Sequence, residues 1–442
     1  MKLESLNPSE THKLSKEKFS LIKDNFLKLF KEYEHKDRIS ILFEFWLWNI
    51  RILYIIYGKK GLSEFLKSDL ASPNRFAILK ATNNSINPII KPKSNTYFFW
   101  LLSFFSKNLF FQGANLRTNR KKILGRISRW FLKSIPIKTD HELKKEIYKL
   151  LIDYLSDIDI DGLEELLLKK LPLTFFSKPI NSRSRFKNIT LECAASCFLE
   201  FANYEMIFLL NKKIYLKGFQ HGGGYDTFCH DYWVEYEKSL CDEFIGWGLS
   251  AVNDKQAKFT KLNYKKSEKK SKKRIIWIED SLPLIFFYMI EPNNYYQPKR
   301  LKSTEYIYSE IKDLGFEYFN LTHPVLPSDK YATFRGKSLK RNNNKGENLF
   351  LPEDIGIFDN SGATLIHFFV ENEMPFVQII DRSDIDRATT KQKEWFKVLY
   401  DAELCFYNDE PQRLASGLKK IMDKGYCLPI EVINYHKKIF RV

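Results

Sequence analysis

Short apolar runs alternate with segments of helical periodicity through the second half of the chain. The runs lie at residues 274–278, 316–321, 355–358 and 375–380. Helices are predicted between and after them, near 304–314, 364–370, 391–402, 409–424 and from 430 onward, with a polar loop at 326–352. Runs of this length, bounded by turn residues, are typical of buried strands. Because strands that alternate with helices pair in parallel, we predict an α/β fold with a mostly parallel sheet and helices on both faces.

The first half is less regular, but it also mixes helices with strands. Helices are predicted over residues 10–70, 140–172 and 188–204, a loop over 85–95, a short strand at 213–216, and a strand with the turn that follows it at 243–248. Within the first helical segment, the stretch from Phe43 to Trp48 is apolar nearly all round, so it is either buried or surface-seeking. We predict a layered α/β arrangement for this half as well.

The most unusual motif of the first half follows the predicted strand at 213–216. It reads Gln220-His221-Gly222-Gly223-Gly224-Tyr225. Glycine weakens regular elements, so three in a row indicate that the backbone approaches another group closely. A strand that ends in a histidine and glycines is consistent with the floor of a cleft. The alternative is a glycine turn with a histidine on the surface.

A second polar motif follows the predicted strand at 355–358. Its residues are Asp359-Asn360-Ser361-Gly362-Ala363-Thr364, and a helix is predicted to begin there. The free N–H groups and the dipole of a helix start attract phosphate, and open α/β sheets bind ligands beyond the carboxyl ends of their strands. The motif lacks the Gly-Lys-Ser/Thr of a Walker loop. N-capping by Asn360 or Ser361 is the alternative.

Polar residues near the other predicted strand ends extend the candidate site. His323-Pro324 follows the strand at 316–321, so His323 is a candidate hydrogen-bond donor to a phosphate, and an ordinary loop residue is the alternative. Asp384 and Asp386 have the spacing of a metal-binding pair, but we place them in a solvated loop beyond the fourth strand. We therefore expect a site that uses amides, hydroxyls and histidine without a metal ion.

A net charge of +17 over 442 residues favours anionic partners: nucleic acid, lipid headgroups or a phosphorylated substrate. Aromatic residues at 97–111 precede a basic segment that contains Arg117, Arg120, Lys121, Lys122, Arg126 and Arg129. Aromatic residues beside a basic helix suit an anionic membrane surface. The alternative is a core helix followed by a solvated basic face, and a nucleic-acid groove has no recognisable binding module to support it.

The N-terminus lacks the apolar core of a signal peptide, and no apolar run reaches the about 20 residues that span a bilayer. We expect a cytoplasmic protein, peripheral on the inner face of the plasma membrane. Its six cysteines form no Cys-x-x-Cys pair, which favours reduced thiols over a zinc site. Cys193 and Cys197, the closest two, are predicted on one face of a helix.

These motifs resemble those of GT-B glycosyltransferases, in particular a bacterial family of surface-polysaccharide transferases that shares the strand followed by Gln220 to Tyr225. The chain is more distantly similar to sialyltransferases and Kdo transferases that use CMP-sugars. Their His-Pro and serine-rich motifs, which hold CMP, are matched by His323-Pro324 and by Ser361 to Thr364. CDP-glycerol transferases of teichoic-acid synthesis are similar too, through His221-Gly222. The resemblance covers about residues 190–420.

Two positions depart from these families. Gln220-His221 stands where sialyltransferases carry a carboxylate motif. His367, a turn before Glu371, stands near the position of the ribose-binding glutamate of many GT-B enzymes.

The resemblance implies two facing Rossmann-like domains with a helical N-terminal extension and a C-terminal crossing helix. It divides the chain into a helical N-terminal, acceptor and membrane-proximal region (1–180), an α/β part of the acceptor domain (181–253), a lysine-rich linker (254–273), a donor-binding domain (274–425) and the C-terminal helix (426–442).

The implied activity is transfer of a sugar, in the first instance a CMP-activated ulosonic acid, to a hydroxyl of a bacterial surface glycan or lipid-linked glycan. No cofactor, metal ion or nucleic acid takes part. His221 is the implied general base, because an imidazole titrates near the working pH. The implied donor contacts are His323, Pro324, Asn360, Ser361, Gly362, Thr364 and His367, and those on the acceptor side are Gln220, Gly222, Gly223, Gly224 and Tyr225. The alternatives are a CDP-polyol phosphotransferase of teichoic-acid type and a non-catalytic glycan-binding GT-B-like protein.

Overall fold

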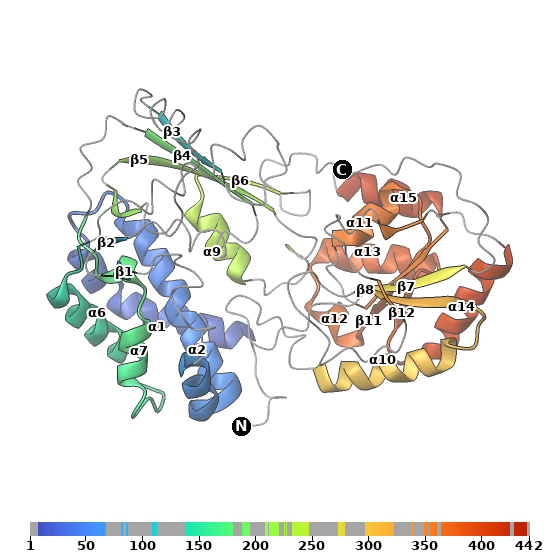
Figure 1. Cartoon of the computed structure of the whole chain (residues 1–442), viewed down its shortest axis with the longest axis horizontal. Coiled ribbons are helices and arrows are strands. Elements are labelled where there is room, and N and C mark those ends of the chain that lie inside the picture. The colour runs from blue at the N-terminus through green and yellow to red at the C-terminus, as the bar shows by residue number, and fades with distance from the viewer. Residues whose placement is uncertain are drawn as a thin grey trace. The chain divides into compact units, whose positions relative to one another are not determined.

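The chain folds into two compact units (Figure 1). One consists of Met1–His221 with Tyr232–Ile245, and the other of Gly222–Asp231 with Gly246–Val442. The computed structural model describes residues 8–67, 81–82, 85–86, 108–112, 138–179, 188–194, 208–210, 212–220, 225, 227, 232–246, 273–278, 297–321, 337–339, 349–351, 353–359, 364–424 and 428–439. The predicted lysine-rich linker, 254–273, lies outside the described residues except for Lys273, so it stays a prediction.

The first unit is built on helices that share an aromatic core. They are α1 (Pro8–Leu29), α2 (Lys36–Lys67), α6 (His141–Tyr154), α7 (Glu164–Lys170) and α9 (Tyr232–Leu240), with a 3-10 turn at Leu173–Phe176. Phe43 of α2 stacks on Phe26 of α1 at 4.6 Å between ring centroids and meets Phe175 edge-on at 5.0 Å. Phe43 and Trp48 are buried, so the apolar stretch of α2 belongs to the core. The helical segments predicted over residues 10–70 and 140–172 are confirmed. Each consists of two helices joined by a turn: α1 and α2 in the first, α6 and α7 in the second.

A four-stranded parallel sheet in the order β3-β4-β5-β6 also belongs to the first unit. Its strands are β3 (Asn108–Gln112), β4 (Asn188–Ala194), β5 (Lys213–Phe219) and β6 (Glu243–Ile245). The strand predicted at 213–216 and the strand predicted to open the segment 243–248 are thereby confirmed. Burial alternates along β5, where Tyr215 is 43% exposed and Leu216 is buried, so one side of this strand faces the core. A separate antiparallel pair joins β1 (Ala81–Thr82) to β2 (Ser85–Ile86), where the loop predicted over 85–95 begins.

Two segments that we predicted as helical are strands instead. Residues 188–194, the start of the helix predicted over 188–204, form β4, so Cys193 lies on a strand beside Gly218. β3, residues 108–112, covers the end of the aromatic run at 97–111, which the alternative interpretation of that segment placed in a core helix. β4 pairs with β3 on one side and with β5 on the other. Hydrogen bonds to two neighbouring strands outweigh the weak local preference for a helix.

The second unit contains a six-stranded parallel sheet. In chain order its strands are β7 (Arg274–Ile278), β8 (Glu317–Leu321), β9 (Lys337–Ser338), β10 (Ile355–Phe358), β11 (Phe376–Ile380) and β12 (Cys405–Tyr407). In space they run β12-β11-β10-β7-β8-β9. This is the order of a doubly wound Rossmann domain, which starts in the middle and is built outward twice. The four predicted strands are confirmed, whereas the short edge strands β9 and β12 were not predicted.

Helices cover both faces of this sheet, as predicted (Figure 1). One face carries α11 (Thr364–Glu371), α13 (Thr390–Asp401) and α15 (Ile430–Ile439), and the other carries α10 (Gln297–Ile311) and α14 (Pro411–Lys424), while α12 (Arg382–Arg387) follows β11. Successive side chains of β7 point alternately into the two cores on either side of the sheet. Ile276 and Ile278 face the α11 side, and Ile275 and Trp277 face the α10 side.

Asp384, which we placed with Asp386 in a solvated loop, belongs to the first turn of α12. Its side chain is buried and its carboxylate accepts a hydrogen bond from the Asp381 N–H at 3.1 Å. This is the backward bond of a capping box, in which a side chain three residues into the helix satisfies the N–H of the capping residue. Asp386 is exposed, so the two carboxylates have different surroundings.

Gly356 allows α11 to approach the sheet closely. A Cβ atom at this position would lie 2.7 Å from Cε1 of Phe369 and 3.0 Å from Cε2 of Phe358, which is closer than carbon atoms pack. Phe369 is buried and meets Phe358 edge-on at 5.2 Å. The short distance between α11 and β10 therefore depends on glycine at position 356, which has no side chain.

A buried ion pair joins the starts of β7 and β10. Asp354 is fully buried and accepts hydrogen bonds from Nε and Nη2 of Arg274 at 2.7 and 2.5 Å, and from the Leu351 N–H at 2.6 Å. Arg274 also lies over the ring of Phe319 at 5.2 Å. The hydrogen bonds that Arg274 donates to Asp354 raise the pKa of Arg274. The pair holds the two central strands together at their amino ends.

The C-terminal helix α15 packs within the second unit. Its Tyr435 stacks on Trp395 of α13 at 6.1 Å, and its His436 contacts His367 of α11. The crossing helix that we expected is not confirmed, because the described contacts of α15 are with these two helices. Across the part of the chain that the structure describes, every helix is too short or too polar to traverse a lipid bilayer.

Candidate functional site

The strand order of the second unit reverses between β7 and β10, which are hydrogen-bonded neighbours. The chain builds from β7 toward β9 and from β10 toward β12, so the connections after the two strands lead to opposite halves of the sheet. Open α/β sheets bind ligands beyond the carboxyl ends of such a strand pair. Residues 359–364 follow β10 directly and lead into α11, so they begin at this point of the sheet.

Asp359 is the first residue beyond β10. Its Oδ2 accepts a hydrogen bond from Nε1 of Trp277, a buried residue of β7, at 3.1 Å. This bond links the two strands across the reversal and fixes where the segment 359–364 begins. Of the predicted phosphate contacts, Asn360, Ser361 and Gly362 lie outside the described residues, and Thr364 is described only as the first residue of α11.

His367, the predicted donor contact inside α11, faces the core. Its Nδ1 lies 3.0 Å from Nε2 of His436 on α15, and the two ring centroids are 5.2 Å apart. Burial lowers the pKa of His367 to about 4, so its ring is neutral at physiological pH. This geometry gives His367 a packing role, and we leave it out of the proposed donor contacts.

The glycine motif begins and ends with buried residues. Gln220 and Tyr225 have 4% and 2% of their surfaces exposed. The N–H of Gln220 donates to the carbonyl oxygen of Ile245 at 2.8 Å, so the pairing between β5 and β6 continues to the residue before His221. His221 and the glycines at 222–224 lie outside the described residues, and their roles stay predictions.

The segment just after the glycine motif is anchored on α13. The carbonyl oxygen of Thr227 accepts a hydrogen bond from the N–H of Thr389 at 3.0 Å, and Thr227 is buried. Thr389 is the N-cap of α13, because its Oγ1 accepts from the Gln392 N–H at 3.4 Å. Our sequence analysis did not predict this contact, because a hydrogen bond between two backbone groups can form between almost any residue types.

Two further groups of predicted site residues cannot be placed. His323 and Pro324 lie outside the described residues, beyond the last described residue of β8, Leu321. The same holds for the basic residues of the predicted membrane surface, Arg117, Arg120, Lys121, Lys122, Arg126 and Arg129. Their assignments stay predictions.

An acidic loop after α6 has the spacing of a calcium-binding loop, which our sequence analysis did not single out. Asp157, Asp159 and Asp161 alternate and are followed by Gly162, whose φ is 77°. In calcium loops a glycine at this place makes the sharp turn. The spacing alone would therefore suggest a metal site.

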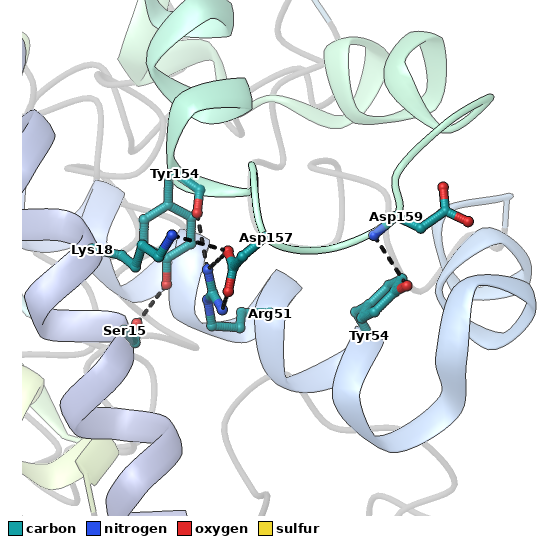
Figure 2. Close-up of polar contacts among 7 residues, drawn as sticks. All are labelled: Ser15, Lys18, Arg51, Tyr54, Tyr154, Asp157 and Asp159. Carbon is teal, nitrogen blue, oxygen red and sulfur yellow. Dashed lines mark hydrogen bonds and ion pairs between the residues drawn. The ribbon is translucent and has the colours of Figure 1, made fainter. Parts of the chain in front are cut away.

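The structure gives Asp157 and Asp159 protein counter-ions instead, and Figure 2 shows those of Asp157. Arg51, whose side chain is 1% exposed, donates to both oxygens of Asp157 at 2.6 and 2.7 Å, and Lys18 lies 3.5 Å away. Lys59 binds Asp159 at 2.8 Å. Hydrogen bonds from Arg51 lower the pKa of Asp157 to about 2. Among the described residues, no group of three or more His, Cys, Asp or Glu could hold a metal, so the loop serves to tie α6 to α1 and α2.

Comparison with known proteins identifies one family. Residues 37–312 match the model of the LIC12162 family transferase. No curated protein matches the chain. Among solved structures, the spinosyn rhamnosyltransferase SpnG is similar over 58% of this chain and 69% of its own, with 9% sequence identity and a TM-score of 0.32. A similarity of this size carries neither fold nor function from one protein to the other.

Proposed function

Because the chain belongs to the LIC12162 family of transferases, we propose that it is a glycosyltransferase of GT-B type, which moves a sugar from a nucleotide-activated donor to a hydroxyl group. The observation that carries the proposal is the place of residues 359–364, between β10 and α11 where the strand order reverses. Parallel sheets of this order bind nucleotides at that point. The first N–H groups of α11 and its dipole suit a phosphate group there.

In the proposed reaction, His221 accepts the proton of the acceptor hydroxyl as its oxygen attacks the anomeric carbon of the donor. The bond between that carbon and the donor phosphate oxygen breaks, and the nucleotide leaves with the electron pair. Hydroxyl and amide groups of Asn360, Ser361 and Thr364, with His323, stabilise the charge that develops on the phosphate. Glycines 222–224 give donor and acceptor room to meet.

For the substrates, we propose a CMP-activated ulosonic acid as donor and a bacterial surface glycan, free or lipid-linked, as acceptor. The match of His323-Pro324 and of Ser361 to Thr364 with CMP-binding motifs supports this choice of donor. A lipid-linked acceptor agrees with the basic segment from Arg117 to Arg129, which suits the anionic inner face of the plasma membrane.

Nucleotide binding tests the donor class. We expect CMP to raise the melting temperature more than CDP, UDP or GDP, because a ligand that binds only the folded state stabilises it by RT ln(1 + [L]/Kd), about 2.7 kcal/mol at a hundredfold excess over Kd. Incubation with a CMP-sugar should release free CMP slowly, because water replaces the acceptor. EDTA should leave this release unchanged, since we expect no metal ion to take part.

Other outcomes point to the alternatives. Release of CMP from CDP-glycerol but not from a CMP-sugar would indicate a polyol phosphotransferase. Binding of a glycan with no stabilisation by any nucleotide would indicate a non-catalytic glycan-binding protein. If neither a nucleotide nor a glycan binds, the glycosyltransferase proposal is wrong.

The anchor at Thr389 gives a second prediction. We expect Thr389→Pro to reduce CMP release several-fold relative to Thr389→Ala. Proline shares the φ of Thr389, −62°, so it should not bend the helix start. It removes only the N–H group that donates to the carbonyl oxygen of Thr227, together with the capping hydroxyl. Alanine removes the capping hydroxyl, at about 1 kcal/mol, and keeps the N–H. The anchored segment begins directly after the glycine motif, so its release should loosen the motif.

Hydrogen exchange serves as the control for this comparison. The amides of residues 225–227 should exchange faster in Thr389→Pro than in Thr389→Ala, while those of α13 should exchange alike in both. Equal CMP release by the two variants, with faster exchange only in the proline variant, would show that the anchor does not support activity.

A further inference from the structure

Helix α11 is held between the sheet and the C-terminal helix. On the sheet side, its Phe369 packs against the backbone of Gly356. On the other side, its His367 lies 3.0 Å from His436 of α15. Residues 366–370 are all buried, so the position of the helix is set by these two contacts and the core around them. The same helix begins at Thr364, at the end of the segment that we assign to phosphate binding.

The contact between the two imidazoles requires a defined protonation state. One ring must donate an N–H and the other must accept it with a lone pair, so the accepting ring is neutral, and burial favours the neutral form of the donating ring as well. A proton on either ring makes its nitrogen charged in a site where charge is costly, and protons on both rings turn the hydrogen bond into a repulsion. The pair is therefore directional, unlike the apolar contacts that surround it.

His436 is enclosed by α11, α13 and its own helix. Its side chain is fully buried, Trp395 of α13 lies 5.8 Å from its ring, and Oε1 of Glu371 on α11 lies 3.7 Å from its Nδ1. Lys437, the next residue on α15, lowers its pKa further, after burial and His367. From α13, Glu394 faces Tyr435 and accepts its hydroxyl hydrogen bond at 2.7 Å.

We propose that His436 is a positioning residue of the donor site: through its hydrogen bond to His367, it fixes the orientation of α11 and thus of the N–H groups that receive the donor phosphate. This rests on the function proposed above. The C-terminal helix then acts on nucleotide binding without touching the nucleotide. Because protonation disturbs this buried pair, donor affinity should also fall as the pH approaches about 4, the value to which burial lowers the pKa of His367.

Substitutions at 436 and 435 separate this role from general packing. His436→Leu removes the partner of His367 and fills similar volume, so we expect about tenfold weaker CMP binding. His436→Gln keeps a polar hydrogen-bonding group near the position of Nε2, and its affinity should stay within about threefold of the wild type. Tyr435→Phe is the matched control, because it removes a bond from the same helix to α13 rather than to α11. CMP affinity is measured by calorimetry, and melting temperature reports folding.

A pH series covers the case in which His436→Leu does not fold. The double variant His367→Asn/His436→Gln has no titrating group at this contact. Between about pH 6 and pH 4, the range that approaches the lowered pKa of His367, CMP affinity should fall more in the wild type than in the double variant, and protonation of CMP itself affects both alike. Parallel pH profiles, or a folded His436→Leu variant that binds CMP like the wild type, would overturn the proposal.

Hydrogen exchange without ligand keeps this test distinct from that of the proposed function. If the wild type binds no nucleotide, the glycosyltransferase proposal fails, yet the orientation of α11 can still be tested. The amides of residues 364–371 should exchange faster in His436→Leu than in Tyr435→Phe. Equal exchange in the two variants would show that His436 does not position α11.

Discussion

Replacing His221 by alanine should reduce CMP release from a CMP-sugar by about 10²- to 10⁴-fold, the usual contribution of a general base. CMP affinity and melting temperature should remain close to those of the wild type, because the proposed donor contacts lie elsewhere in the chain. The variant should therefore lose turnover without losing its donor. Steady-state release assays and calorimetry on the same preparations measure the two effects separately.

The matched control for this prediction is His141→Ala. His141 is the exposed first residue of α6, so its loss removes an imidazole without affecting the core. We expect it to keep wild-type turnover. If His221→Ala retains more than about a tenth of wild-type turnover, His221 is not the base, and another group near the acceptor must take the proton.

Asp354→Asn should destabilise the second unit by about 3–5 kcal/mol, the usual cost of breaking a buried ion pair from one side. The amide cannot balance the charge of Arg274, whose side chain is 11% exposed. It also presents an NH₂ donor where the carboxylate accepted hydrogen bonds from Arg274 and from the Leu351 N–H. The urea midpoint at pH 7 is the measurement.

A solvent-exposed pair in the same unit is the comparison. Glu403 binds Lys420 at 2.8 Å with both side chains about half exposed. Glu403→Gln should therefore cost less than about 1 kcal/mol. The double variant Arg274→Met/Asp354→Leu should recover much of the loss, because an apolar pair leaves no buried charge. A small effect of Asp354→Asn alone would mean that water reaches Arg274.

The elements of the second unit were largely predictable because local signals and tertiary contacts agree there. Gly315 has a φ of 83° and lies between α10 and β8, which matches the helix stop that its residue type predicts. β7, β10 and β11 are buried at every position, so they appear in the sequence as nearly continuous apolar runs, with Arg274 at the start of β7 and Gln378 within β11 as the polar members. The strands β9 and β12 lie at the two edges of the sheet and are short: β9 consists of two polar residues, and β12 of three residues.

In the first unit, local signals were weaker. β4 contains Asn188, Glu192 and Ala194, whose residue types do not favour a strand, and it becomes one through pairing on both sides. Asp157, Asp159 and Asp161 show the opposite case. Their spacing is a clear local pattern, typical of a calcium-binding loop, but Asp157 and Asp159 bind basic side chains of the protein instead. Arg51 comes from a helix about a hundred residues earlier and neutralises Asp157. Residue types alone contain no information on such a partner.

The sequence by itself determined that the second half alternates strands with helices, and that polar motifs follow two of those strands at 322–324 and 359–364. These are local properties, set by periodicity and by residues that start or stop an element. Only the tertiary structure decided that β10 lies beside β7, that Thr389 holds the segment after the glycine motif, and that His436 meets His367. Each of these contacts joins segments far apart in the chain, and their pairing is selected by packing and hydrogen bonding of the whole unit.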